Sequence, residues 1–457
     1  MKNLDKYIVS LDSSIKEALI KIEKNKEGFI LVQNLENQII GIVTDGDIRR
    51  QLLIDPNLNL KIETCTNQKF TFYTNEISHE FIYKQLSSDL KAIPILNSKG
   101  ELLNIITKDN IPKRIDQKFY ARSKSPVRIS FGGGGSDTSN FINRNNGAVI
   151  NSTISLYAHA TLHKRDDFRI HIESFDLNEK VEFESLNSLN DYNGKLNLIL
   201  SLIKTICPEF GFELFVYSDF PISSGLGGSS AVLSSIIGCF NLYKINKWND
   251  YEMAEIIYEA ERINLGIQGG WQDQYATVFG GFNLIEFKNN ENLVIPLKLN
   301  KDSILELEES LILCYTNSDH GSNSIHDDQK NNSNKKSTIN NILKNVKLTY
   351  KMRDLILKSN FNELGQLLDK SWKLKKTFSS KISNSILDNI YSEALRNGAV
   401  GGKLLGAGGG GFFMFYVPFE NKFKLMNWIR KNENLEIVNF HFEKNGLQAW
   451  INRIYEN

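Results

Sequence analysis

Three glycine-rich stretches, set far apart along the chain, constrain its fold more than any other feature. They lie at Gly132–Gly135, Gly225–Gly228 and Gly406–Gly411, and each adjoins an apolar segment. Glycine loses more conformational entropy on folding than other residues, so such runs occur where the backbone needs a positive φ or approaches another group closely. A single run would fit a turn. Three runs predict one site, to which distant parts of the chain each contribute a loop.

The composition limits the class of protein. A chain of 457 residues is long enough for about two to four domains, and its net charge of +1 gives no reason to expect a nucleic acid or an anionic membrane as partner. The four cysteines and seven histidines show no metal-ligand spacing. The N-terminus is polar, and no run approaches the roughly 20 apolar residues of a membrane helix. We therefore expect a cytoplasmic protein with reduced thiols.

Residues 1–115 contain an internal repeat. The first unit has predicted strands at Phe29–Val32 and Ile39–Val43, and the second has them at Ala92–Leu96 and Leu102–Ile106. A helical pattern precedes the strands in both units, and a turn separates them. Neither unit is large enough to bury its apolar face alone, so the two are expected to pack about a pseudo-twofold axis.

The segment Gly41–Ile48, with a weaker copy at Asn104–Ile111, resembles the CBS domain, two of which form a Bateman module. The resemblance implies that Thr44 and Asp47 contact the ribose of an adenine nucleotide, whereas Asn110 replaces the aspartate in the second copy. Such a pair would act in regulation or oligomerisation, and we expect a homo-oligomer through it. The alternative is structural: Thr44 caps the following helix and Asp47 favours its first turn.

The segment from Pro221 to Ala231 is predicted to join a strand to a helix. Its glycines let backbone N–H groups turn toward a ligand, and the helix N-terminus adds free donors and a partial positive charge. These features indicate phosphate binding, and Ser229 or Ser230 could coordinate Mg²⁺ or cap the helix. No Gly-Lys-Ser/Thr sequence ends the loop, so it is not a Walker A motif. The alternative is a tight turn with serine caps.

This loop, together with Ser125–Asp137 and Gly402–Phe412, resembles the three motifs of the GHMP kinases, in the order of that family. The resemblance implies an α+β fold of two lobes, ribosomal S5-like over residues 125–315 and ferredoxin-like over 316–457, after a linker at 116–124. It also implies ATP and Mg²⁺ as cofactors. The residues implied to bind ATP are Pro221, Ser224, Gly225, Leu226, Gly227, Gly228, Ser229, Ser230 and Ala231.

The same resemblance assigns the catalytic groups. Asp273 matches the catalytic base, and Arg128 matches the arginine beside the phosphoryl-accepting hydroxyl. Glu261 matches an acid that binds Mg²⁺, with Ser229 as a second ligand. Chemically, the carboxylate orients the hydroxyl and takes its proton, and the metal offsets charge on the phosphates. The alternatives are a surface arginine and solvated helix carboxylates.

For the acceptor, the resemblance implies hydrogen bonds between sugar hydroxyls and Asp137, because a carboxylate can accept two such bonds from a diol. Gly134 and Gly135 stand where galactokinases carry an acid and a histidine, which argues against galactokinase, and their backbone is expected to line the sugar site. Gly409 and Gly410 either contact the substrate or belong to a buried hairpin.

The sequences Arg128–Asp137 and Gln272–Ala276 narrow the resemblance to the D-glycero-D-manno-heptose 7-phosphate kinases and their close relatives. The implied activity is ATP-dependent phosphorylation of the anomeric hydroxyl of a heptose 7-phosphate or a similar sugar, for nucleotide-sugar synthesis. Another sugar, such as fucose or a uronic acid, is one alternative, and a nucleotide-sensing protein without kinase activity is another. Lys375 and Lys376 could reach a substrate phosphate, but the sequence favours a solvated lysine face.

Overall fold

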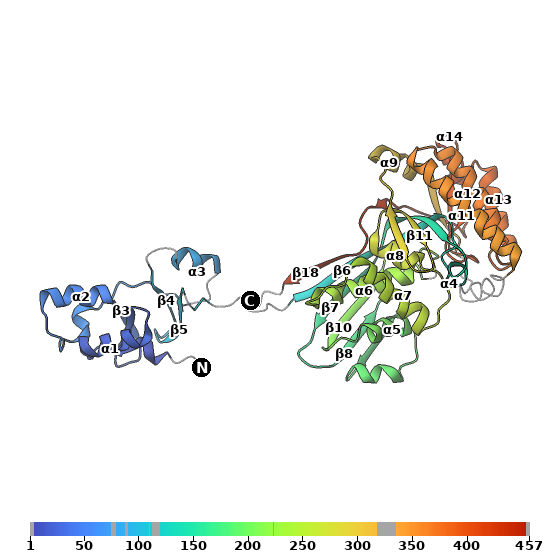
Figure 1. Ribbon diagram of the computed structural model, residues 1–457. Coiled ribbons are helices and arrows are strands. Elements are labelled where there is room, and N and C mark those ends of the chain that lie inside the picture. Colours follow the sequence, from blue (N-terminus) through green and yellow to red (C-terminus); the bar gives the residue numbers. More distant parts are fainter. Residues whose placement is uncertain are drawn as a thin grey trace. The chain divides into compact units, whose positions relative to one another are not determined.

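The structure is a computed structural model that describes residues 4–74, 79–86, 90–108, 110–111, 119–222, 224–317 and 335–453. The chain divides into two compact units, Met1–Gln117 (unit 1) and Lys118–Asn457 (unit 2). Helices and strands occur in both units, as Figure 1 shows, and the predicted α+β class is confirmed.

The first half of unit 1 is a three-stranded sheet with two helices. Strand β1 (Ile8–Ser10) pairs in parallel with β2 (Phe29–Gln33), which pairs antiparallel with β3 (Ile39–Thr44). Helices α1 (Ile15–Asn25) and α2 (Asp45–Ile54) each begin with a capping box, in which the N-cap residue and the third helical residue each accept the other's backbone N–H. Two 3₁₀ turns accompany them: η1 (Asp5–Tyr7) and η2 (Ile62–Cys65).

The second half of unit 1 repeats this order. Helix α3 (His79–Leu86) precedes the antiparallel strands β4 (Ala92–Leu96) and β5 (Leu102–Thr107). A parallel bridge joins Tyr73 to Ile95 in the manner of β1 and β2, so the predicted repeat is confirmed. Apolar side chains from both halves form one core, as predicted for units too small to fold alone: Tyr7, Phe29, Leu31, Ile39, Ala92, Leu96 and Ile105.

Unit 2 is built on a sheet of nine strands among the described residues. Its longest strands, β6 (Phe119–Gly132) and β7 (Gly147–Lys164), pair antiparallel, and β6 runs directly into the first glycine stretch. The strand order is β12-β11-β7-β10-β8-β9, and β6 also pairs with β7 and β18. The other strands are β8 (Ile170–Ser174), β9 (Glu179–Phe183), β10 (Phe212–Ser218), β11 (Phe282–Phe287), β12 (Asn292–Pro296), β17 (Phe442–Glu443) and β18 (Gln448–Arg453).

Helices α5–α8 pack on this sheet and complete its core (Figure 1). The apolar helix α6 (Gly228–Tyr243) lies against β6 and β7, so its N-terminus points to the end of β6 where the glycine stretch begins. Helix α7 (Asp250–Tyr258) continues as one π-helical turn, Glu259–Asn264. The remaining helical segments are α4 (Ser139–Ile142), η3 (Leu186–Asp191), α5 (Asn197–Ile206) and α8 (Gln272–Phe279).

A second, antiparallel sheet of four strands follows, in the order β14-β15-β13-β16. Its strands are β13 (Leu311–Tyr315), β14 (Gly401–Leu404), β15 (Phe412–Tyr416) and β16 (Glu436–Val438). The helices that accompany it are α9 (Lys301–Glu309), α11 (Lys336–Leu357), α12 (Phe361–Lys376), α13 (Ser385–Arg396) and α14 (Phe419–Arg430). Figure 1 shows α11–α14 gathered on one side of unit 2.

Strand β15 is buried on both faces and joins the two sheets of unit 2. On one face, Phe413 and Phe415 pack with Trp372 of α12. On the other face, Phe412 and Met414 share a core with alternate side chains of β6, which include Val127, Ile129 and Phe131. The strands that carry the first and third glycine stretches therefore lie against one another through a common core.

The limits predicted for the linker and the two lobes require correction. Residues 119–124 of the predicted linker are the start of β6 and pair with β18, while 116–118 lie outside the described residues. Their polar composition hides a strand because the inward positions carry small residues, Ala121 and Ser123. Strand β13 precedes the predicted lobe boundary but pairs in the second sheet, and β17 and β18 follow it but pair in the first.

The return of the chain to the first sheet depends on Gly446. A Cβ at this position would lie 2.0 Å from the backbone oxygen of Val278. Gly446→Ala should lower the free energy of unfolding by about 2 kcal/mol or more. The new Cβ would clash with backbone atoms, which cannot move aside as the end of a flexible side chain can. Urea unfolding followed by tryptophan fluorescence measures this, since all five tryptophans lie in unit 2.

Gly134→Ala is the matched control for this variant. A Cβ on Gly134 meets no atom within 4 Å. Its free energy of unfolding should therefore stay within about 0.5 kcal/mol of the unmodified chain. Equal stability of the two alanine variants would contradict the steric argument.

Candidate active site

The second and third glycine stretches meet backbone to backbone. Gly225 and Gly406 both have positive φ, at 77° and 67°. A Cβ on Gly406 would lie 2.5 Å from the Cα of Gly225, and one on Gly411 would lie 2.5 Å from the backbone oxygen of Ser224. Only glycine combines this conformation with this closeness. The prediction that distant glycine stretches form one site is confirmed for these two.

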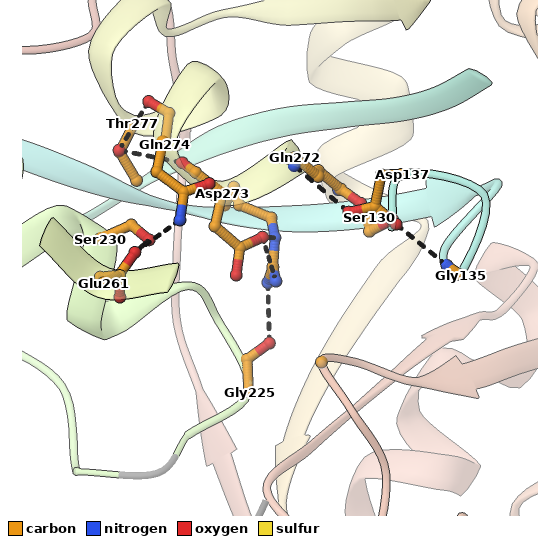
Figure 2. Close-up of polar contacts among 12 residues, drawn as sticks. Ser130, Gly135, Asp137, Gly225, Ser230, Glu261, Gln272, Asp273, Gln274 and Thr277 are labelled. Atoms are coloured by element: carbon orange, nitrogen blue, oxygen red, sulfur yellow. Dashed lines mark hydrogen bonds and ion pairs between the residues drawn. The ribbon is translucent and has the colours of Figure 1, made fainter. Parts of the chain in front are cut away.

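Arg128 of β6 connects the first stretch to the second. Its backbone N–H donates to Leu226 O at 2.9 Å, and its Nη1 donates to Gly225 O at 2.7 Å. The rest of the guanidinium faces the carboxylate of Asp273, with Nε 2.9 Å and Nη2 2.7 Å from Oδ1. Arg128 is only 5% exposed. The structure therefore brings the two predicted catalytic residues into one ion pair, and Figure 2 shows Asp273 above Gly225.

Asp137 lies on the other side of Asp273 from Glu261 in Figure 2. Its Oδ1 accepts the Gly135 N–H at 3.1 Å and its Oδ2 accepts the Gln272 N–H at 3.2 Å. Burial, and next the Asp273 carboxylate, raise the pKa of Asp137 above its ordinary value. The residue is thus held by backbone donors at the wall of a cavity, as the predicted role in binding sugar hydroxyls requires.

Glu261 is fully buried in the π-helical turn. Its Oε2 accepts Ser230 Oγ at 2.8 Å and Gln274 Nε2 at 2.5 Å. The structure therefore places Ser230 beside Glu261, whereas Ser229, the predicted second metal ligand, is exposed and lines the cavity. Adjacent side chains on a helix point in different directions, so only one of the two serines can face Glu261. The sequence alone does not show which one it is.

The residues present fit a magnesium ion in part. Glu261 Oε1 is buried and has no hydrogen-bond partner among the described residues, so one carboxylate oxygen is available to a cation. No cluster of three or more His, Cys, Asp or Glu side chains with metal-binding geometry occurs in the described part of the chain. Magnesium commonly uses one or two protein carboxylates together with substrate phosphates, so a single available carboxylate matches its chemistry.

Most of these groups surround a cavity of about 430 Å³, whereas Glu261 is fully buried and is not among its lining residues. The predicted residues that line it are Arg128, Gly134, Gly135, Asp137, Pro221, Ser224, Gly225, Gly227, Gly228, Ser229, Asp273 and Gly410. Others named by the sequence lie behind its wall. Leu226 and Ala231 belong to the apolar core, Ser230 is buried, and the Gly409 N–H donates to Ile382 O at 2.9 Å.

The outer part of the cavity is a region that sequence reasoning missed. It lies between β8, β10 and α5 and is largely apolar, with one lysine and one aspartate. The residues are Ser174, Asp176, Leu177, Lys195, Leu198, Ile199, Val216, Ser218, Phe220 and Ile222. These residues show only the periodicity of strands and a helix and belong to no motif. No local feature of the sequence would therefore have identified them as part of the cavity.

Two buried lysines line the inner part of the cavity, and neither was predicted to be buried. Lys375 of α12 is 7% exposed and Lys403 of β14 is 3% exposed. The prediction of a solvated lysine face is therefore wrong for Lys375. It holds better for Lys376, which is partly exposed and forms an ion pair with Asp388 at 2.9 Å. The last turn of α12 contains three lysines, and lysines in this position are typical of an exposed helix end, where they interact favourably with the helix dipole. The sequence therefore contains no sign that Lys375 is buried and Lys376 is not.

In unit 1, Thr44 and Asp47 form the capping box of α2. Thr44 N–H donates to Asp47 Oδ2 at 2.8 Å, and Thr44 Oγ1 donates to the same oxygen at 2.6 Å. Asp47 also pairs with Arg50. The structural alternative for these two residues is confirmed, and their role toward a nucleotide stays a prediction.

Comparison with known proteins places this site in a family. Residues 197–281 match the profile of the GHMP kinases N terminal domain, 352–422 match the GHMP kinases C terminal profile, and 3–54 match the CBS domain. The chain is 38% identical to a D-glycero-alpha-D-manno-heptose 7-phosphate kinase of Campylobacter jejuni, over 72% of this chain and 98% of that protein.

A crystal structure of a D-glycero-D-manno-heptose 1-phosphate kinase from Bacteroides thetaiotaomicron matches with a TM-score of 0.62 at 30% identity, over 74% of this chain and all of that one. Similarity to the L-fucokinase/L-fucose-1-P guanylyltransferase of Bacteroides fragilis is lower, at 26% over 65% of this chain and 34% of that protein. The chain belongs to the GHMP kinase family, whose members transfer a phosphoryl group, and it carries an N-terminal CBS domain. None of the helices in the described ranges has the length and apolar character to cross a membrane.

The burial of Lys375 links stability to pH. Burial, and next Arg128, lower its pKa from 10.5 to about 7, and Asp137 opposes the shift. Between these values the unfolded chain binds more protons than the folded chain, so the contribution of Lys375 to stability rises with pH. Lys375→Met should remove this rise. The free energy of unfolding of the variant relative to the unmodified chain should thus be larger at pH 6 than at pH 9, and urea titrations that give one value at both pHs would contradict it.

Proposed function

We propose that this protein transfers the γ-phosphoryl group of ATP, with Mg²⁺, to the anomeric hydroxyl of a heptose 7-phosphate or a similar sugar. The observation that carries the proposal is the Arg128–Asp273 ion pair, which lies on the cavity wall where two glycine loops meet. Similarity to the heptose 7-phosphate kinase of Campylobacter jejuni supports the choice of acceptor.

The two ends of the cavity suit the two substrates. Apolar side chains between β8, β10 and α5 fit the base of the nucleotide, and the glycine loop with the α6 N-terminus fits its phosphates. Gly227 and Gly228 lie at that N-terminus, where helix N–H groups have no partner within the helix. Glu261, together with a serine of the α6 N-terminus, would hold Mg²⁺, which supplies positive charge to the phosphates when bound. Ser230 contacts Glu261, and Ser229 lines the cavity.

Asp273 is proposed to act as the base. Its carboxylate, fixed by Arg128 on one side, lies at the cavity wall and would accept the proton of the acceptor hydroxyl as that oxygen attacks phosphorus. Arg128 would keep the carboxylate in place and offset negative charge on the group in transfer. Asp137 would orient the sugar, since its two oxygens keep acceptor capacity after the two backbone bonds.

The assay that tests the proposal combines the purified protein, MgATP and a panel of acceptors. We expect ADP release with D-glycero-D-manno-heptose 7-phosphate, and a product phosphorylated at the anomeric position by NMR. Asp273→Asn should lower kcat by about 10² to 10⁴-fold while ATP binding persists, because the amide cannot take the proton.

Two controls make the outcome specific. Asp354→Asn removes an exposed carboxylate of α11 and should leave kcat unchanged. L-Fucose, D-glucuronate and unphosphorylated heptose test the other acceptors. If only one of these three sugars is phosphorylated, that sugar is the acceptor in place of the heptose 7-phosphate. If neither they nor the heptose 7-phosphate causes ADP release, the kinase function is refuted.

We further propose that residues 1–115 bind an adenine nucleotide and regulate or assemble the kinase. Thr44 and Asp47 border strand β3 and helix α2 within the matched CBS domain. Thr44→Val should weaken AMP binding by the full chain at least about tenfold, because a hydrogen bond to the ribose is lost. Calorimetry measures the affinity.

Ser14→Ala is the matched control for this variant. Ser14 begins α1 with the same capping box, and it is no part of the predicted nucleotide site. Each substitution should cost about 1 kcal/mol of helix capping, but only Thr44→Val should change AMP affinity. An equal effect in both variants would leave Thr44 with the role of a helix cap alone.

A further inference from the structure

The inner part of the cavity holds more positive than negative charge. The charged side chains that line the cavity, among the described residues, are Arg128, Asp137, Asp176, Lys195, Arg262, Asp273, Lys375 and Lys403. Asp176 and Lys195 belong to its outer part, and Arg262 lies 3.8 Å from the buried Glu261. Arg128 is paired with Asp273. The two lysines have no carboxylate within 4 Å among the described residues, and Asp137 is the only other anion that faces them. When both lysines are protonated, one positive charge therefore has no counter-charge in the inner part of the cavity.

The lysine ammonium groups also have unused hydrogen-bond donors. Lys375 Nζ donates to Leu404 O at 3.1 Å and to Gly406 O at 2.5 Å. Lys403 Nζ donates only to Phe131 O, at a long 3.4 Å, within the described part of the chain. Since an ammonium carries three N–H donors, one remains free on Lys375 and two on Lys403. Burial without a counter-ion is costly, so a ligand of opposite charge is expected.

The position of these groups indicates which ligand would satisfy them. Lys375 is bonded to Gly406, whose backbone packs on Gly225, and Gly225 O in turn accepts from Arg128. The free donors therefore lie beside the catalytic ion pair rather than at the apolar end of the cavity. A phosphate group matches these features, because it is negatively charged and its several oxygens can accept from the free donors of both lysines.

We propose that Lys375 and Lys403, together with Arg128, form a binding subsite for a phosphoryl group on the inner wall of the cavity. The proposal rests on the proposed kinase function and gives a role to two lysines: Lys375, which lies outside the three motifs, and Lys403, which lies within the third. The phosphoryl group has two possible sources, the γ-phosphoryl group in transfer and the phosphate that the acceptor already carries.

The subsite predicts a proton uptake. Burial lowers the pKa of Lys375 to about 7, and burial followed by Lys375 lowers that of Lys403 well below its ordinary value. A bound phosphate favours the ammonium form, so binding at pH 8 should draw protons from solution. The other charged groups that act on the two lysines are Arg128 of β6 and Asp137 of the following loop.

The direct test uses inorganic phosphate and the full chain saturated with MgADP. Calorimetry at pH 8, in two buffers of different ionisation enthalpy, gives both affinity and proton uptake. Lys375→Met and Lys403→Met should each weaken phosphate binding about tenfold or more, as expected for loss of one charged hydrogen-bond donor. Lys376→Met, next in the chain and paired with Asp388, is the control and should bind as the unmodified protein. Unchanged binding in both Lys375→Met and Lys403→Met overturns the proposal.

Arginine variants protect the test against misfolding. Lys375→Arg and Lys403→Arg keep the charge, and arginine does not titrate near neutral pH. Phosphate should therefore still bind to both, and proton uptake should decrease in each relative to the unmodified chain. Loss of phosphate binding in both arginine variants, with the folded fluorescence spectrum retained, also overturns the subsite.

Kinetics distinguish the two sources of the phosphoryl group. If the methionine variants raise KM for the sugar phosphate but leave KM for the unphosphorylated sugar unchanged, the subsite holds the phosphate of the acceptor. If kcat decreases with both acceptors, it holds the group in transfer. Parameters equal to those of Lys376→Met overturn the proposal. A protein that binds phosphate through these lysines but phosphorylates no sugar would refute the proposed function and leave the subsite standing.

Discussion

The backbone contact between Gly225 and Gly406 is the constraint on which the rest of the site depends. With a Cβ on Gly406 the two loops would overlap at 2.5 Å, so this approach requires glycine. The contact fixes Gly225 O, and that oxygen accepts from Arg128. Arg128 in turn pairs with Asp273, so a steric fact about two glycines determines where the ion pair proposed for catalysis can lie.

The common core beneath these loops explains why the charges are tolerated. Alternate side chains of β6 and β15 pack together, so the strand that carries Arg128 and the strand that follows Gly411 share one apolar core. A buried ion pair gives little net stability, because desolvation offsets most of its attraction. The apolar core therefore stabilises the fold, and the charged groups above it serve the ligands.

Much of this arrangement was predictable from the sequence. The repeat in unit 1, the capping box at Thr44, the loop-to-helix transition before α6 and the pairing of Arg128 with Asp273 all follow from local patterns or from the motifs. The start of β6 was not predictable, because its inward residues are small and its outward residues polar. The predicted boundary between the two lobes was wrong because β18 pairs with β6, a strand more than three hundred residues earlier in the chain. The sequence of a strand does not show which distant strand it pairs with.

The sequence by itself determined the local properties: which residues can adopt positive φ, which cap helices, and in which order the motifs occur. Only the tertiary structure decided which charged groups meet. Lys375 and Lys376 are neighbours with the same chemistry, yet one faces β14 and the cavity while the other pairs with Asp388 at the surface. Whether a side chain is buried depends on which distant segments pack over it. Burial in turn is the largest cause of the lowered pKa of Lys375.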